Sequence, residues 1–125
     1  MRLYKTKWFH RWAAREGLTG EVLRAAVVEL EQGLADALGG YVYKQRVALP
    51  GRGKRGGART LIAFRRGQAV FFLYGYSKNE RANINNAELR ALRLLAKELL
   101  GYSEQGLARA INAGELIEVN DDGKT

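Results

Sequence analysis

The hydrophobic pattern of the chain changes its period at Gly39-Gly40, and this change limits the folds that the chain can adopt. Before the glycine pair, apolar residues recur every three or four positions, as they do on one face of a helix. After it, residues 41–48 alternate between two faces, which is the pattern of a β-strand. Helical spacing returns after Asn85. The sequence therefore predicts an α+β fold with helices before and after a group of strands.

Two helices forming a hairpin are expected before the glycine pair. Thr6 caps the first helix, over residues 7–16, and Gly17 ends it. Thr19 caps the second, which is expected to continue to the glycine pair because its apolar stripe consists of Leu23, Val27, Leu30, Leu34 and Leu38. Residues 1–4, ahead of both helices, are expected to form a short edge strand.

Three strands are expected after the glycine pair, over residues 41–48, 59–65 and 69–76. Short connections between consecutive strands make an antiparallel meander, packed on the helices. Residues 50–57, with the sequence PGRGKRGG, are expected to be a loop because four glycines and a proline fit no regular element. A tight hairpin at residues 66–68 joins the second and third strands.

The C-terminal part of the chain is predicted to be mainly helical. Asn85 and Glu88 have the spacing of a capping box for a helix that Gly101 ends. Ser103 caps a short last helix, and residues 115–119 are predicted to form a short strand.

The length of the chain, 125 residues, is ordinary for one domain. We expect a single domain over residues 1–119, with a core at 1–100 and a C-terminal extension at 101–119, followed by a frayed tail at 120–125. No apolar run reaches the roughly 20 residues of a membrane span, and the N-terminus lacks the apolar stretch of a signal peptide. A cytoplasmic protein without membrane contact is therefore expected.

The charge of the chain is concentrated in its middle. Positive residues exceed negative ones by 8, and no acidic residue lies between Asp36 and Glu80. That segment holds nine cations, namely Lys44, Arg46, Arg52, Lys54, Arg55, Arg59, Arg65, Arg66 and Lys78. Binding to a nucleic acid would relieve their mutual repulsion and release counterions. A solvated basic face, or a surface for an acidic protein, is the alternative interpretation.

The composition argues against metal and cofactor chemistry. The chain has no cysteine and one histidine, His10, so a zinc site would lack its usual ligands. Residues 51–56 spell GxGxxG, but a dinucleotide site needs a helix directly after this motif, and here a strand is expected. We expect no cofactor and no metal. The glycine-rich segment is interpreted as a basic hairpin tip that can approach phosphates closely.

Four cations are expected to converge on one patch of the meander. Lys44 and Arg46 lie two residues apart on one strand and so share a face. Arg59 opens the next strand, and Lys78 follows the third. Tyr76, on the third strand, is a candidate for stacking on a base or donating a proton, with core packing as the alternative. An exposed strand face decorated with cations is the simpler interpretation of the patch.

The order of these elements and residues resembles the RelE/ParE toxin superfamily. Three segments look closest to its HigB-like branch: YKTKWFHRWA (4–13), KQRVALPGRGKRGGARTLIAFR (44–65) and FFLYGYSKNERANI (71–84). The resemblance covers residues 1–100. It implies a RelE-like fold and a metal-independent endoribonuclease that cuts mRNA on the ribosome and inhibits translation. It also implies a partner antitoxin, expected to carry a helix-turn-helix DNA-binding domain.

The resemblance also implies roles for individual residues. The basic residues of the family's first meander strand correspond to Lys44 and Arg46, the arginine of the next strand to Arg59, and the basic residue after the last strand to Lys78. These toxins often have a late tyrosine, where this chain has Asn83-Ile84, so Tyr76 is a substitute candidate. Apart from the resemblance, the RNA-binding residues are expected to be Arg52, Lys54, Arg55, Arg65 and Asn79.

These residue types suit cleavage of RNA by its own 2′-hydroxyl group. The planar guanidinium groups of Arg59 and Arg46 can stabilise the charge of the phosphate in the transition state. Lys44 and Lys78 are candidates for proton transfer, in an order that the sequence leaves open, because neighbouring cations lower the pKa of a lysine. Two other functions remain open. One is a ParE-like poison of DNA gyrase on the same fold, and the other is a non-catalytic nucleic-acid-binding module.

Overall fold

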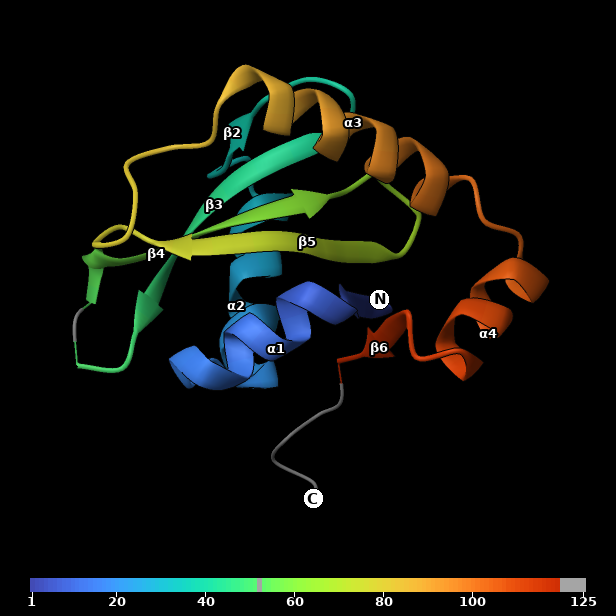
Figure 1. Cartoon of the computed structure of the whole chain (residues 1–125), viewed down its shortest axis with the longest axis horizontal. Coiled ribbons are helices and arrows are strands. Elements are labelled where there is room, and N and C mark those ends of the chain that lie inside the picture. Colours follow the sequence, from blue (N-terminus) through green and yellow to red (C-terminus); the bar gives the residue numbers. More distant parts are fainter. Residues whose placement is uncertain (52, 120–125) are drawn as a thin grey trace.

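The computed structural model describes residues 1–51 and 53–119; of residues 53–56 only the backbone is described. The middle layer is a six-stranded sheet with the order β2-β3-β4-β5-β1-β6. The helices α1 and α2 cover one face of the sheet and α3 covers the other (Figure 1), so each face has its own apolar core. In chain order the elements are β1 (Leu3–Thr6), α1 (Lys7–Glu16), α2 (Gly20–Glu31), β2 (Asp36–Ala37), β3 (Val42–Leu49), β4 (Gly53–Ala63), β5 (Val70–Ser77), α3 (Asn86–Leu100), α4 (Glu104–Asn112) and β6 (Leu116–Glu118).

The α+β fold and most of the predicted elements are confirmed. The first helix has the predicted bounds, and the Thr6 hydroxyl both accepts a hydrogen bond from the Phe9 N–H (3.1 Å) and donates one to the Leu73 carbonyl (2.9 Å). Such a cap stabilises a helix by about 1 kcal/mol, and here it also fixes α1 against β5. The predicted capping box of Asn85 and Glu88 is present at the start of α3.

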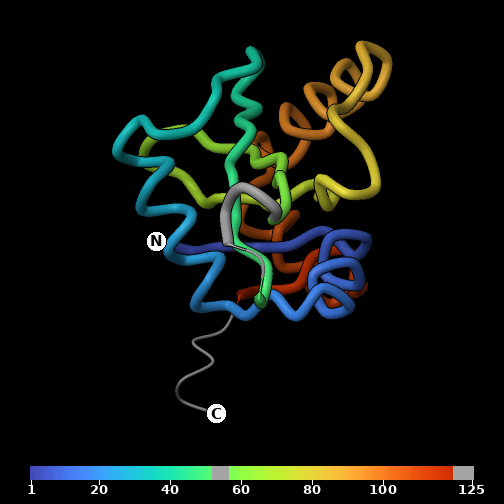
Figure 2. The backbone as a smooth tube through the Cα atoms, turned by 90° about the vertical axis from the view of Figure 1, so that its left-hand side faces the viewer, coloured from blue at the N-terminus to red at the C-terminus, as the bar shows by residue number. Residues whose placement is uncertain are grey.

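The meander is confirmed as an antiparallel arrangement of β3, β4 and β5. β5 lies between β4 and β1 and is buried along nearly its whole length. Its Gly75 faces the indole ring of Trp12, and an added Cβ atom would lie 2.3 Å from that ring. Only glycine therefore allows α1 to pack this closely on β5. Figure 2, turned by a quarter, shows α1 and α3 on opposite sides of the strands.

Two expectations on strand order and helix length were wrong. The N-terminal strand is not at an edge, because β1 pairs in parallel with β5 and antiparallel with β6. The second helix ends at Glu31, because Gly33 adopts a left-handed backbone (φ 80°) directly after it. Leu34 and Leu38 therefore lie outside the helix, and the pair Asp36–Ala37 forms the short strand β2 on the edge of β3.

The predicted loop at residues 50–57 is also shorter than expected, because β4 already begins at Gly53. Gly53 pairs with Leu49 of β3, and the Gly57 carbonyl accepts a hydrogen bond from the Lys78 N–H (3.1 Å). Hydrogen bonds to partners on both sides override the weak strand propensity of glycine. The frayed tail expected at 120–125 lies outside the described residues. Within the described part of the chain, no helix is long and apolar enough to cross a membrane.

Candidate active site

The register of the meander places three predicted site residues side by side. Arg46 of β3 lies directly opposite Arg59 of β4, and Arg59 lies directly opposite Tyr76 of β5. Directly paired residues point to the same face of a sheet, and here it is the face that α3 covers, since Tyr76 belongs to that core. We call Arg46, Arg59 and Tyr76 the row. Lys44 lies one step along the same face of β3, opposite Leu61.

Arg59, at the centre of the row, is a buried cation. Only 9% of its surface is exposed, and its Nη1 donates a hydrogen bond to the Ala58 carbonyl at 3.4 Å. Within residues 1–51 and 53–119, no carboxylate forms an ion pair with it. Buried charges in proteins are normally paired, because taking a cation out of water without a counter-ion is costly. A phosphate group would supply the missing negative charge.

Tyr76 is buried on the other side of Arg59, with 2% of its surface exposed. Burial raises the pKa of its phenol, although the positive charges of Arg59 and Arg81 act in the opposite direction. The phenol is therefore protonated at neutral pH and can donate a hydrogen bond or a proton. It donates to the side-chain oxygen of Asn83 at 3.4 Å.

Asn83 connects two members of the predicted site. Its side-chain oxygen, Oδ1, accepts from the Tyr76 hydroxyl and also from the Lys44 ammonium group at 3.5 Å. The same oxygen accepts from the Ile84 N–H at 2.9 Å, which fixes its orientation within the segment between β5 and α3. The Asn83 oxygen thus joins the hydroxyl of Tyr76 on β5 to the ammonium group of Lys44 on β3.

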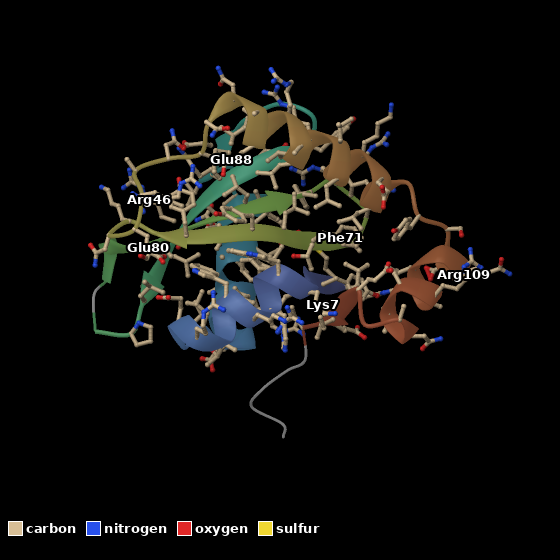
Figure 3. All side chains as sticks on the ribbon, viewed as in Figure 1. Lys7, Arg46, Phe71, Glu80, Glu88 and Arg109 are labelled. Carbon is tan, nitrogen blue, oxygen red and sulfur yellow. The ribbon has the colours of Figure 1, made fainter. Side chains whose placement is uncertain are left out.

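Arg81 and Glu88 form the wall of the site on the α3 side. The Arg81 guanidinium donates two hydrogen bonds to the Glu88 carboxylate, at 2.6 and 2.8 Å, and its Nε donates to the Asn83 carbonyl at 2.9 Å. It also lies over the ring of Tyr76, 5.7 Å from the centroid. Hydrogen bonds from Arg81 and from the Asn85 backbone hold the pKa of Glu88 at about 2. Figure 3 shows Arg46 and Glu88 at the same end of the sheet.

The roles of Arg81 and Asn83 were missed in the sequence. Arg81 is one of many arginines, and nothing in its spacing indicates that it reaches back to Tyr76. Asn83 stands where the resemblance predicts a tyrosine, and that departure was the available signal. Its contact with Tyr76 depends on the path of residues 78–85 across the end of β5, which local pattern does not fix.

The remaining predicted residues are not all part of this arrangement. Lys78 is exposed, two residues beyond Tyr76, and its N–H pairs with Gly57 at the end of the meander. Asn79 is exposed next to it. Arg65 lies apart from the row, just past the opposite end of β4, with its guanidinium over the ring of Tyr41. The side chains of Arg52, Lys54 and Arg55 lie outside the described residues, so their predicted contacts stay predictions.

An aromatic stack leads from α1 to the row. Trp8 is 44% exposed and stacks on Tyr74 with 4.3 Å between ring centroids. Tyr74 in turn lies 6.4 Å from Tyr76, measured between centroids, and its hydroxyl accepts from Arg81 at 3.5 Å. The stack supports the α1 side of the site. In the described residues, no group of three or more acidic or histidine side chains could hold a metal ion.

The family of the chain follows from a comparison with known protein families. A model of the RelE toxin of the RelE/RelB toxin-antitoxin system matches residues 1–119. The chain belongs to the RelE toxin family. A comparison with curated proteins gives no match. The RelE toxin assignment confirms the superfamily resemblance and implies an antitoxin partner, while the HigB-like branch stays a prediction.

Proposed function

We propose that this RelE-family toxin cleaves mRNA on the ribosome and so inhibits translation. The observation that carries the proposal is Arg59, a buried guanidinium without a carboxylate partner in the described residues, flanked by Arg46 and Tyr76 on the same sheet face. A phosphodiester seated over the row would receive hydrogen bonds from both arginines, whose planar forks match two phosphate oxygens.

The proposed reaction uses the 2′-hydroxyl of the RNA as the nucleophile. A base removes the proton of this hydroxyl while its oxygen attacks the neighbouring phosphorus atom. The bond to the 5′-oxygen breaks, and an acid returns a proton to that oxygen. The products are a 2′,3′-cyclic phosphate and a free 5′-hydroxyl, so the step consumes no water.

The residues of the site divide these tasks. Arg59 and Arg46 stabilise the extra negative charge on the phosphate in the transition state. Tyr76, whose raised pKa keeps its phenol protonated, can donate to the phosphate or to the leaving oxygen. Lys44, held by Asn83, and Lys78, exposed beyond the row, are the proton-transfer candidates.

The ribosome enters the proposal through substrate positioning. The site has neither a histidine pair nor a cluster of metal ligands in the described residues, so its acid–base chemistry is modest. Holding the 2′-oxygen in line with the leaving oxygen contributes several kcal/mol to catalysis of such a step. A translating ribosome presents a fixed stretch of message and can supply this orientation.

The test is induction of the chain in bacteria beside Arg59→Ala and Lys44→Ala, with Arg15→Ala on the distant helix α1 as the matched control. We expect growth arrest and mapped cuts in translated messages for the wild type and the control, and loss of both in the two site variants. The cuts should carry 2′,3′-cyclic phosphate ends. Folding of each variant is checked by thermal unfolding.

The same experiment separates the two rival functions. Growth arrest with intact messages and damaged DNA would contradict the nuclease and support a ParE-like gyrase poison. An absence of toxicity, with salt-sensitive RNA binding by the purified chain, would support a non-catalytic binding module. The row supports the nuclease over the binding module, because binding alone does not require a buried arginine that lacks a carboxylate partner in the described residues.

A further inference from the structure

A second basic surface lies along α3, at the other end of the sheet from the row. Here α3, the end of β4 and the turn before β3 enclose a groove of about 610 Å³. Its lining includes apolar side chains, Tyr41, Leu94 and Leu100, which we call the floor, and basic ones, Arg65, Arg90 and Lys97, which we call the rim. We call this the α3 groove. The nuclease proposal does not use it.

The turn that forms one wall of the groove is held in shape by Arg93. The Arg93 guanidinium donates two hydrogen bonds, from Nε and Nη2, to the Leu38 carbonyl. Gly39, Gly40 and Tyr41 then follow with φ angles of 87°, 61° and 65°, a backbone region that glycine adopts readily and tyrosine rarely. A Cβ atom at Gly40 would lie 3.0 Å from the Arg93 side chain. Contacts within the chain therefore hold this wall in shape without a bound partner.

The floor of the groove leaves apolar surface open to solvent. Leu94, at 71%, is the most exposed large apolar side chain in the described residues, and Tyr41 is 49% exposed. Arg90, Leu94 and Lys97 are spaced three and four residues apart, so they share one face of α3. This face is adjacent to the buried stripe of Ala96 and Leu99, which packs on the sheet.

The charges at the rim are not compensated. Arg65, Arg90 and Lys97 have no ion pair within the described part of the chain, and none of the residues that line the groove is acidic. Arg65 lies over the Tyr41 ring, 5.3 Å from its centroid, so cation and apolar floor form one continuous surface. A ligand that covers this surface needs apolar groups for the floor and negative charge for the rim.

We propose that the α3 groove binds an acidic amphipathic segment of the antitoxin, with apolar side chains on Tyr41 and Leu94 and carboxylates on Arg65, Arg90 and Lys97. The proposal rests on the toxin–antitoxin assignment and is independent of the reaction at the row. RNA fits the groove less well than a peptide does. Phosphates would satisfy the rim, but the open leucine surface is removed from water only by apolar side chains.

The test uses a labelled synthetic peptide of about 18 residues, five helical turns, with leucine on one face and glutamate on the other. Its binding to the purified chain is measured by fluorescence anisotropy. Leu94→Ala should weaken binding roughly 10-fold by removing apolar contact area. Arg90→Glu/Lys97→Glu should weaken it by at least as much through like-charge repulsion.

Two controls isolate the groove from general charge attraction. The double variant Arg11→Glu/Arg15→Glu makes the same change of charge on exposed positions of α1 and should bind the peptide as the wild type does. A peptide of identical composition in scrambled order, without an apolar face, should bind weakly to all proteins. Thermal unfolding confirms that each variant is folded.

The remaining outcomes overturn the proposal. Equal binding of the ordered and scrambled peptides, or equal loss in both double variants, would show attraction by net charge alone. Tight binding of a single-stranded RNA of the same length that Arg90→Glu/Lys97→Glu abolishes and Leu94→Ala leaves intact would assign the groove to RNA. The peptide assay contains no RNA, so its result does not depend on the nuclease proposal. Peptide binding by a chain that cuts no message would support the groove proposal and contradict only the nuclease proposal.

Discussion

The two ends of the sheet carry the same kind of charge in opposite surroundings. At the row, the cation Arg59 is buried, with 9% exposed, and its neighbours offer a hydroxyl, an amide and an ammonium group. At the α3 groove, the apolar floor is open, with Leu94 71% exposed, and the cations stand at the rim. The burial of a cation and the groups around it therefore indicate its ligand better than the number of cations does.

The largest expected difference between the two ends concerns the shape of the cation. Arg59→Lys keeps the charge but removes the planar fork, and we expect mRNA cleavage to fall roughly 100-fold. Arg90→Lys at the groove should change the affinity for the acidic peptide by less than about threefold, because an exposed rim needs only charge. Cleavage rates on programmed ribosomes and peptide anisotropy measure the two effects. Equal sensitivity at both ends would contradict the distinction between them.

The next effect concerns Asn83, which aligns groups at the row without being charged. Asn83→Ala removes the oxygen shared by Lys44 and Tyr76, and we expect the cleavage rate to fall about 10-fold through loss of alignment. Asn83→Asp keeps that oxygen but adds a negative charge that repels the phosphate, so we expect it to restore little of the rate. Binding of the acidic peptide should be unchanged in both variants, because Asn83 does not line the groove. A rate unaffected by Asn83→Ala would remove this residue from the site.

The smallest expected effect is a difference in acid sensitivity. The pKa of Glu88 falls from 4.5 to about 2 on folding, so its pairing with Arg81 stabilises the fold above the higher value and is lost as the pH falls through the lower one. The melting temperature of the wild type should therefore decrease between pH 4.5 and pH 2 more than that of Glu88→Gln does. The α3 groove has no acidic lining and should not contribute to this difference. Parallel curves for the two proteins would exclude a stabilising role for the pair.

The site was only partly predictable from the sequence. Lys44 and Arg46 were assigned to one face because strand alternation is local, and the cluster with Arg59 followed from the meander. Arg81 and Asn83 were missed because their contacts with Tyr76 join segments whose relative path no periodic pattern encodes. Arg65 was grouped with the RNA-binding cations by charge alone, yet it lies at the groove end beside Tyr41.

By itself, the sequence determined the helix starts at Thr6, Thr19, Asn85 and Ser103 and the alternation of the meander strands, because caps and periodicity are properties of a few neighbouring residues. Tertiary structure decided the strand order, which places β1 inside the sheet, and the extension of β4 back to Gly53. It also decided which cations are buried and which stand at an apolar rim. Pairing and burial depend on contacts between distant segments, and their free energy overrides local preference.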